Sequence, residues 1–112
     1  MSKNFTITGN EEGVMIAKFE ACCPKIDARN YEEIQNEIIE ILKNRDINNF
    51  VFDLDNVSYV SSAGLRMFSA VNKVASENCI DYKLINLVSE IYRMFELTGY
   101  ASAFKIEEKV QI

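Results

Sequence analysis

Apolar and polar residues alternate near the start of the chain in a pattern that predicts a β-hairpin. Residues 5–8 alternate between the two kinds, and residues 14–19 resume an extended pattern after the turn-forming segment Gly9–Gly13. Alternation with a period of two is typical of a strand with one buried face, and glycine and asparagine favour tight turns. We therefore expect two strands joined by a turn, with Pro24 closing this unit.

A helical period follows the hairpin. Apolar residues recur every three or four positions from Tyr31 to Leu42, and acidic residues occupy many of the positions between them. This spacing predicts an amphipathic helix that runs to about Lys43 and has a solvated outer face. Asp27 precedes the helix, at a place where its carboxylate can cap the helix N-terminus.

The second half of the chain alternates strands and helices. The apolar run 49–54 predicts a central strand covered by helices, and residues 82–85 and 104–106 predict two further strands. Helical spacing predicts helices over residues 63–78 and 88–98, the second ended by a glycine. Strands that alternate with helices after a hairpin indicate an α/β fold, a mixed β-sheet of four to five strands packed against α-helices.

The size and charge of the chain limit the classes of function. With 112 residues, 48% hydrophobic and 26% charged, the chain has the composition of one soluble globular domain. Its net charge of −5, from 17 acidic and 12 basic residues, is unfavourable for binding nucleic acid. No apolar run reaches the roughly 18 residues of a membrane span, and the first residues lack a signal-peptide core. We therefore expect a cytoplasmic protein with a protein partner, no nucleic acid and no membrane insertion.

The residue types that are missing exclude several kinds of catalysis. The chain has no histidine, so a Ser-His-Asp or Cys-His site cannot form within it, and the commonest zinc ligand is absent. Its four glycines are scattered and form no phosphate-binding loop. Cys22, Cys23 and Cys79 lack the spacing of a metal site or a disulfide framework, which favours reduced thiols. We expect no catalytic residue, no cofactor and no metal ion.

Two adjacent serines, Ser61 and Ser62, stand where an extended segment gives way to the second helix. A helix N-terminus has unpaired backbone N–H groups and a partial positive charge, which suit either a capping hydroxyl or a phosphoryl group. As a cap, either serine is worth on the order of 1 kcal/mol. The two roles are compatible, because the capping oxygen is then also the one that is phosphorylated. A third role, Ser62 as a nucleophile, has no base nearby in the sequence.

The order of the elements and the segment from Val57 to Leu65 resemble the STAS domain family of anti-sigma factor antagonists. The family signature follows a strand and a short link and reads Asp-Ser-Ser/Thr-Gly-Leu or Ser-Ser-Ala-Gly-Leu. Here it is Ser61-Ser62-Ala63-Gly64-Leu65, and further matches are Asp27, Phe52-Asp53-Leu54 and Leu97-Thr98-Gly99-Tyr100 with Phe104. The similarity covers about residues 5–108 and implies that residues 1–112 form a single STAS domain.

The resemblance implies a partner switch without catalysis by this chain. In such antagonists a serine of the signature is phosphorylated by a partner that is both an anti-sigma factor and a serine protein kinase, and a PP2C-type phosphatase reverses the modification. The unphosphorylated form binds the anti-sigma factor and so releases a sigma factor. The resemblance places the phosphoacceptor at Ser62, with Ser61 as a rival because many relatives have an acid there. The surround of the phosphosite and the partner interface are then expected to comprise Asp27, Asp53, Ser61, Ala63, Gly64, Leu65, Arg66 and Met67.

Several of these residues also have a structural interpretation. Gly64 either lets the helix approach a neighbouring element or leaves room for a kinase. Met67 faces the partner or belongs to the core, and Asp53 accepts hydrogen bonds at a strand end or surrounds Ser62. The resemblance also leaves open an alternative function for the whole protein, that of a constitutive STAS subunit of a transporter-associated or stress-signalling complex, without phosphorylation. Ser61 in place of the acid favours that alternative.

Overall fold

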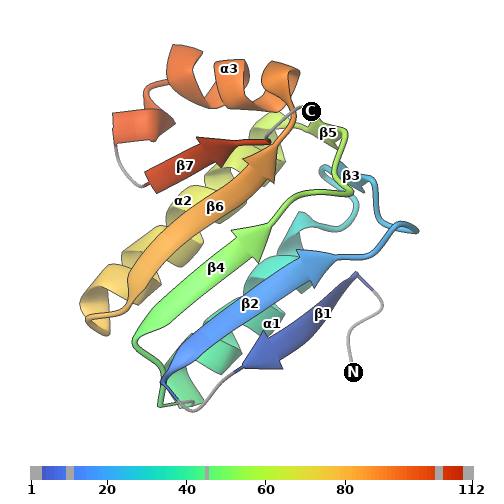
Figure 1. Ribbon diagram of the computed structural model, residues 1–112. Coiled ribbons are helices and arrows are strands. Elements are labelled where there is room, and N and C mark those ends of the chain that lie inside the picture. Colours follow the sequence, from blue (N-terminus) through green and yellow to red (C-terminus); the bar gives the residue numbers. More distant parts are fainter. Residues whose placement is uncertain (1–3, 10–11, 45, 103–104, 110–112) are drawn as a thin grey trace.

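A mixed sheet forms the centre of the molecule. The computed structural model describes residues 4–9, 12–44, 46–102 and 105–109. In these residues five strands form one sheet in the order β1-β2-β4-β6-β7, and β3 and β5 form a small separate sheet (Figure 1). β1 is antiparallel to β2, and the other neighbouring strands are parallel. The expected mixed sheet packed against helices is confirmed.

The bounds of the elements follow the predicted pattern closely. Both ends of α2 and the C-terminal end of α1 agree with prediction to within one residue, but α1 begins at Tyr31, three residues later than a cap at Asp27 implies. The last strand is confirmed from Lys105 onward, while Phe104 lies outside the described residues. The strands are β1 (Phe5–Gly9), β2 (Val14–Phe19), β3 (Lys25–Ile26), β4 (Asn49–Asp53), β5 (Tyr59–Val60), β6 (Asp81–Leu87) and β7 (Lys105–Glu108). The helices are α1 (Tyr31–Asn44), α2 (Ser62–Glu77) and α3 (Ser89–Leu97), followed by a 3₁₀ turn at Tyr100–Ser102.

The hairpin of β1 and β2 buries one face, as its alternation predicts. Phe5 pairs with Phe19 across the hairpin and both side chains are buried, whereas Thr6 and its partner Lys18 on the other face are exposed. Gly13 closes the turn with φ +83°, a left-handed conformation that glycine adopts without steric cost. The hairpin therefore adds two strands to one edge of the sheet.

The helices cover one face of the sheet. Figure 1 shows α1 and α2 behind the sheet, while the face toward the viewer carries no helix. Phe50 and Phe52 of β4 are fully buried. Val51, whose side chain points to the opposite face, is only 7% exposed because its register neighbours Ile16 and Lys83 flank it on β2 and β6. The prediction that β4 is a central strand is therefore confirmed, and the predicted covering by helices holds for one of its faces.

An aromatic cluster joins the sheet to α2. The ring centroid of Phe52 lies 5.7 Å from that of Phe19, 5.1 Å from that of Phe68 and 5.9 Å from that of Tyr82. The Tyr82 hydroxyl donates a hydrogen bond of 3.1 Å to the backbone oxygen of Phe68 in α2. Burial raises the pKa of Tyr82 well above its usual value of 10.0. These contacts fix the position of α2, whose first turn carries the two serines.

Candidate functional site

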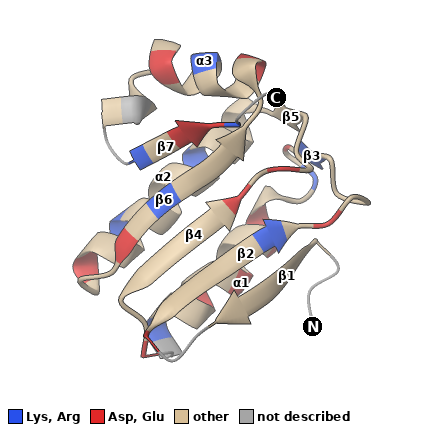
Figure 2. Ribbon diagram, in the orientation of Figure 1, with Lys and Arg blue, Asp and Glu red and all other residues tan. Residues whose placement is uncertain are grey.

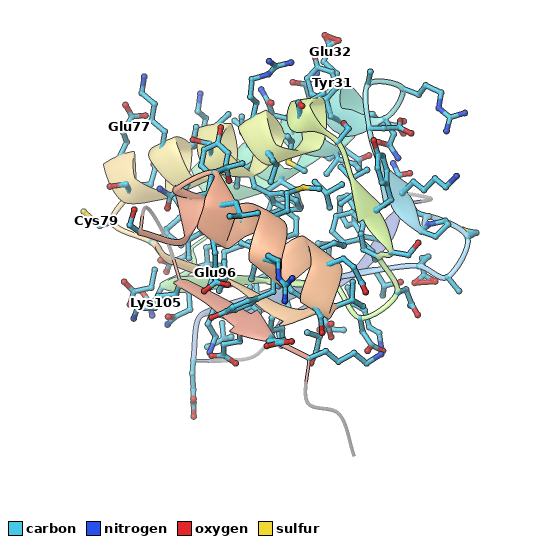
Figure 3. The ribbon with its side chains drawn as sticks, turned by 90° about the horizontal axis from the view of Figure 1, so that it is seen from above. Tyr31, Glu32, Glu77, Cys79, Glu96 and Lys105 are labelled. Atoms are coloured by element: carbon cyan, nitrogen blue, oxygen red, sulfur yellow. The ribbon has the colours of Figure 1, made fainter. Side chains whose placement is uncertain are left out.

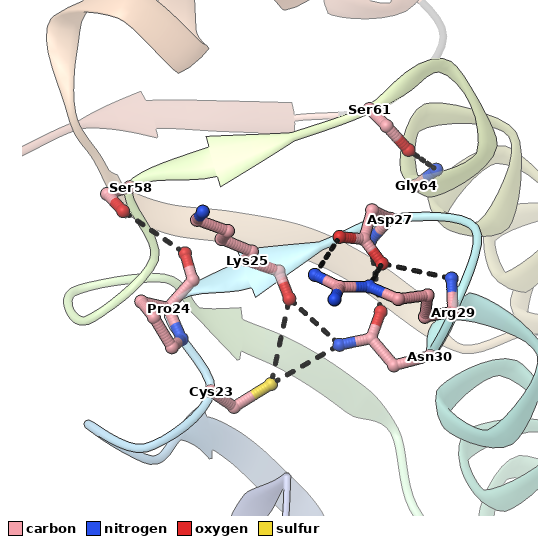
Figure 4. Close-up of polar contacts among 9 residues, drawn as sticks. All are labelled: Cys23, Pro24, Lys25, Asp27, Arg29, Asn30, Ser58, Ser61 and Gly64. Atoms are coloured by element: carbon pink, nitrogen blue, oxygen red, sulfur yellow. Dashed lines mark hydrogen bonds and ion pairs between the residues drawn. The ribbon is translucent and has the colours of Figure 1, made fainter.

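The small sheet of β3 and β5 holds the start of α2. Ile26 pairs with Val60 in parallel register, and the Ser61 N–H donates a hydrogen bond of 2.9 Å to the Ile26 oxygen. At the other end of the pair, the Ser58 N–H donates to the Pro24 oxygen at 2.8 Å. Figure 4 shows the two short strands side by side, with Asp27 and Ser61 just beyond them. The serines therefore lie beside a segment that is distant from them in the sequence.

Ser61 is the N-cap of α2. Its backbone is extended, with φ −85° and ψ 176°, and its side-chain oxygen accepts a hydrogen bond of 3.3 Å from the Gly64 N–H. Its backbone oxygen accepts the first helical bond, from the Leu65 N–H at 2.9 Å. The expectation that one of the serines caps the helix is confirmed, and the capping residue is Ser61.

Ser62 is the first residue of α2 and is exposed. Among the described residues, its side chain has no hydrogen-bond partner. The idea that one oxygen both caps the helix and accepts the phosphoryl group is therefore wrong for an acceptor at Ser62. Ser61 therefore provides the cap, and Ser62 is the exposed serine of the two.

Gly64 lies where the start of α2 meets the small sheet. A Cβ at this position would stand 2.8 Å from Val60 Cγ1, 2.9 Å from the Ile26 oxygen and 3.1 Å from Ile26 Cγ2. Such distances are too short for a side chain, and the Ile26 oxygen is fixed because it accepts the Ser61 hydrogen bond. This confirms the structural interpretation of Gly64, a close approach between the helix and its neighbour.

The rest of the signature points mostly into the protein. Met67 is fully buried, and Ala63 and Leu65 are only 8% and 6% exposed, because the helical period turns these positions toward the core. The prediction that Met67 contacts a partner is therefore wrong, and Ala63 and Leu65 have almost no surface to offer one. Arg66 is exposed, like Ser62.

Asp27 belongs to the turn before α1 and not to the helix itself. The helix begins at Tyr31, and the Asp27 carboxylate accepts hydrogen bonds from the Arg29 N–H at 2.9 Å and from Arg29 Nη2 at 3.0 Å. The Arg29 hydrogen bonds lower the pKa of Asp27 from its usual value of 3.8. Asp27 therefore caps the turn that leads into α1, since its backbone oxygen also accepts a hydrogen bond of 3.0 Å from the Tyr31 N–H; it does not cap the first turn of α1 itself, as predicted. Its negative charge stays one residue beyond Ile26, beside the serines.

Asp53 acts as a hydrogen-bond acceptor at the end of β4. Its Oδ1 accepts from the Asp55 N–H and from Asn86 Nδ2, both at 3.0 Å. Asn86 has φ +61°, a left-handed conformation that asparagine tolerates better than most residues. The first of the two interpretations of Asp53 therefore holds: it joins the ends of β4 and β6 and the loop that leads to β5.

Charge is mixed on the face of the molecule that Figure 2 shows. Lys and Arg alternate with Asp and Glu there, without a continuous basic stripe. Within the described residues, no group of three or more Asp, Glu or Cys residues has the arrangement to hold a metal ion. The same residues contain no helix that is long and apolar enough to span a membrane. All three cysteines are thiols, and burial raises the pKa of Cys23.

The fold and the serine-bearing start of α2 together define the class of protein. The family model of the STAS domain matches residues 12–111 of the chain. The chain therefore belongs to the STAS domain family.

Individual relatives agree with this assignment. The anti-sigma-B factor antagonist of Staphylococcus aureus (strain NCTC 8325) is 24% identical over 88 residues, which are 79% of this chain and 81% of the relative. An anti-sigma-factor antagonist (STAS) domain protein from Planctomyces limnophilus superposes with a TM-score of 0.81 at 14% identity, over 96% of this chain and 91% of that one. The Bacillus cell fate determinant SpoIIAA in its phosphorylated form superposes with a TM-score of 0.69 at 12% identity, over 91% of this chain and 89% of that one. At these identities the two solved structures show the shared fold.

Proposed function

We propose that this chain is an anti-sigma factor antagonist controlled by phosphorylation of Ser62. The observation that carries the proposal is that the two serines differ in structural role: Ser61 Oγ caps α2, and Ser62 is exposed and so accessible to a kinase. The S. aureus relative is named as an anti-sigma-B factor antagonist, and the SpoIIAA structure is of a phosphorylated form. Both support the proposal.

The unmodified chain binds an anti-sigma factor that is also a serine protein kinase, and so releases a sigma factor. Phosphorylation of Ser62 ends the binding, and a PP2C-type phosphatase restores it. The chain itself contributes a binding surface and no catalytic step. Residues 1–112 act as one STAS domain in this proposal.

The charge of a phosphoryl group is sufficient for such a switch. Phosphorylation adds about −1.5 to −2 charges, and at an exposed helix start this costs the fold little. In a docked complex the same group must lose water beside Asp27, and an unpaired buried charge costs about 3 kcal/mol or more. At ~1.4 kcal/mol per tenfold change, that loss weakens binding more than a hundredfold.

The test compares partner binding by four purified forms of the chain. The anti-sigma factor from the same host is titrated against the unmodified chain, Ser62→Ala, Ser62→Asp and Ser76→Asp. Ser76 is exposed on the same helix, near its C-terminal end, and so controls for added charge alone. We expect Ser62→Asp to bind at least tenfold more weakly and the other three forms to bind alike. Equal affinity of Ser62→Asp and the unmodified chain would contradict the proposal.

A second measurement locates the modification. Mass spectrometry of the peptide from Asn56 to Arg66, isolated from the host under growth and under stress, is expected to place a phosphoryl group on Ser62. A peptide that is unmodified in both conditions, with partner binding that Ser62→Asp leaves unchanged, favours the constitutive STAS subunit instead. Labelling of Ser62 by a fluorophosphonate probe would contradict a purely binding role.

A further inference from the structure

The exposed side of α2 is uneven in charge. Ser62, Arg66 and Lys73 are exposed on it, and no Asp or Glu occurs in the helix before Glu77, its last residue. Figure 3 shows Glu77 at the end of α2 away from Tyr31 and Glu32 of α1. Successive exposed positions four apart lie on the same side of a helix, about 6 Å apart along its axis. Arg66 is therefore the cation of α2 that stands nearest to Ser62.

The Arg66 guanidinium has no bonding partner among the described residues of the unmodified chain. In the part of the chain that the structure describes, Arg66 forms no ion pair and no hydrogen bond through its side chain, whereas Arg29 is bound to Asp27 at 3.0 Å. Both arginines lie near the start of α2, because Asp27 is one residue beyond the β3 partner of Val60. Only one of them has to give up an existing partner in order to meet a new anion.

We infer that Arg66 receives the phosphoryl group of phosphorylated Ser62 within the same chain, as a pair between residues four apart on α2. This inference rests on the proposed function, because it assumes that Ser62 is the acceptor. Arginine suits the role, since its planar guanidinium donates two parallel hydrogen bonds to phosphate oxygens. The order of the pair, with the anion nearer the helix N-terminus, is the favourable one.

The pair gives the switch a second component. In the unmodified chain the Arg66 cation is available on the exposed side of α2, where an acidic group of a partner can meet it. In the phosphorylated chain the same cation is occupied by the phosphoryl group. Phosphorylation therefore adds an anion to this surface and at the same time withdraws a cation from it.

The test uses phosphoserine placed at position 62 during translation, so that it needs neither the kinase nor the partner. The phosphorus NMR signal is titrated with pH in the otherwise unchanged chain and in Arg66→Gln, Arg66→Lys, Arg29→Gln and Lys73→Gln. Lys73 is eleven residues from Ser62, about 16 Å along the helix, and serves as the matched control. Each variant keeps the same helix N-terminus, so the contribution of that N-terminus to the phosphoserine pKa cancels in the comparison.

We expect Arg66→Gln to raise the second pKa of phosphoserine by about 0.5 unit, a threefold change in proton affinity, and to remove most of its salt dependence. Arg66→Lys is expected to keep part of the lowering of the phosphoserine pKa that Arg66 causes. Lys73→Gln is expected to change this pKa by no more than about 0.1 unit, because its charge is remote and screened. An unchanged pKa in Arg66→Gln, or a larger change in Arg29→Gln than in Arg66→Gln, would overturn the inference. Neither result would bear on whether the host kinase modifies Ser62, which the peptide measurement decides separately.

Discussion

Replacement of Gly64 by alanine tests whether the start of α2 is held by close packing. The added methyl group meets Val60 Cγ1 at 2.8 Å and the Ile26 oxygen at 2.9 Å. Overpacking of this kind costs about 1–3 kcal/mol, whereas alanine in place of glycine gains about 1 kcal/mol in a helix interior and less in its first turn. The Ile26 oxygen cannot move away without weakening its hydrogen bond from the Ser61 N–H. We therefore expect a net loss of about 1–2 kcal/mol in the free energy of unfolding.

Urea denaturation of the purified chain measures this loss. With a slope of about 1–2 kcal/mol per molar urea for a chain of this size, the midpoint is expected to fall by about 1 M. Gly9→Ala is the matched control, because a Cβ there meets its nearest neighbours at 3.7 Å and the expected change is within about 0.5 kcal/mol. The double variant Val60→Ala/Gly64→Ala relieves only the side-chain contact, so the clash with the Ile26 oxygen should remain. Equal or greater stability of Gly64→Ala would refute the reasoning.

Two further predictions concern stability. Ser61→Ala should lower the free energy of unfolding by about 1 kcal/mol because it removes the N-cap, whereas Ser62→Ala should change it by less than about 0.5 kcal/mol. Urea titrations of both variants measure these changes, and a larger loss in Ser62→Ala than in Ser61→Ala would show that Ser61 is not the cap. Tyr82→Phe should cost about 1 kcal/mol, the worth of its buried hydrogen bond to Phe68. Because burial raises the pKa of Tyr82 in the folded chain, the contribution of this residue to the free energy of unfolding is fully present below pH 10 and is lost as the pH rises above that value. The decline in stability at alkaline pH should therefore be shallower in Tyr82→Phe, and identical pH profiles of the two proteins would contradict this.

The sequence predicts the long elements well because their patterns are periodic and supported by burial. Each long element buries one or both of its faces, and the spacing of its apolar residues follows from that burial. These elements are the helices at residues 31–44 and 62–77 and the strands β1, β2, β4 and β6. The pair of β3 and β5 has two residues in each strand, which is too short for a period to be recognised. The covering of β4 on one face only also escapes prediction, since neighbouring strands bury Val51 as effectively as a helix does.

The candidate site is only partly readable from the sequence. That a serine caps α2 follows from residue type and position, but which serine does so depends on the backbone conformation that the small sheet imposes on Ser61. The inward orientation of Met67 follows from the helical period once the first helical residue is known. Asp27 shows the opposite case: its carboxylate caps the turn before α1 and pairs with the Arg29 side chain, and neither contact leaves a periodic pattern in the sequence.

The hydrogen bond between the Ser61 N–H and the Ile26 oxygen has a consequence for the rate at which a partner is exchanged. Together with the close packing of Gly64, it fixes the surface around Ser62 before any partner arrives. A preformed surface needs no ordering step, so association with a partner should not be limited by a conformational change of this surface. Under the proposed function, a charge added at Ser62 would then change partner exchange through electrostatics alone, in the association rate as well as in the residence time of the complex.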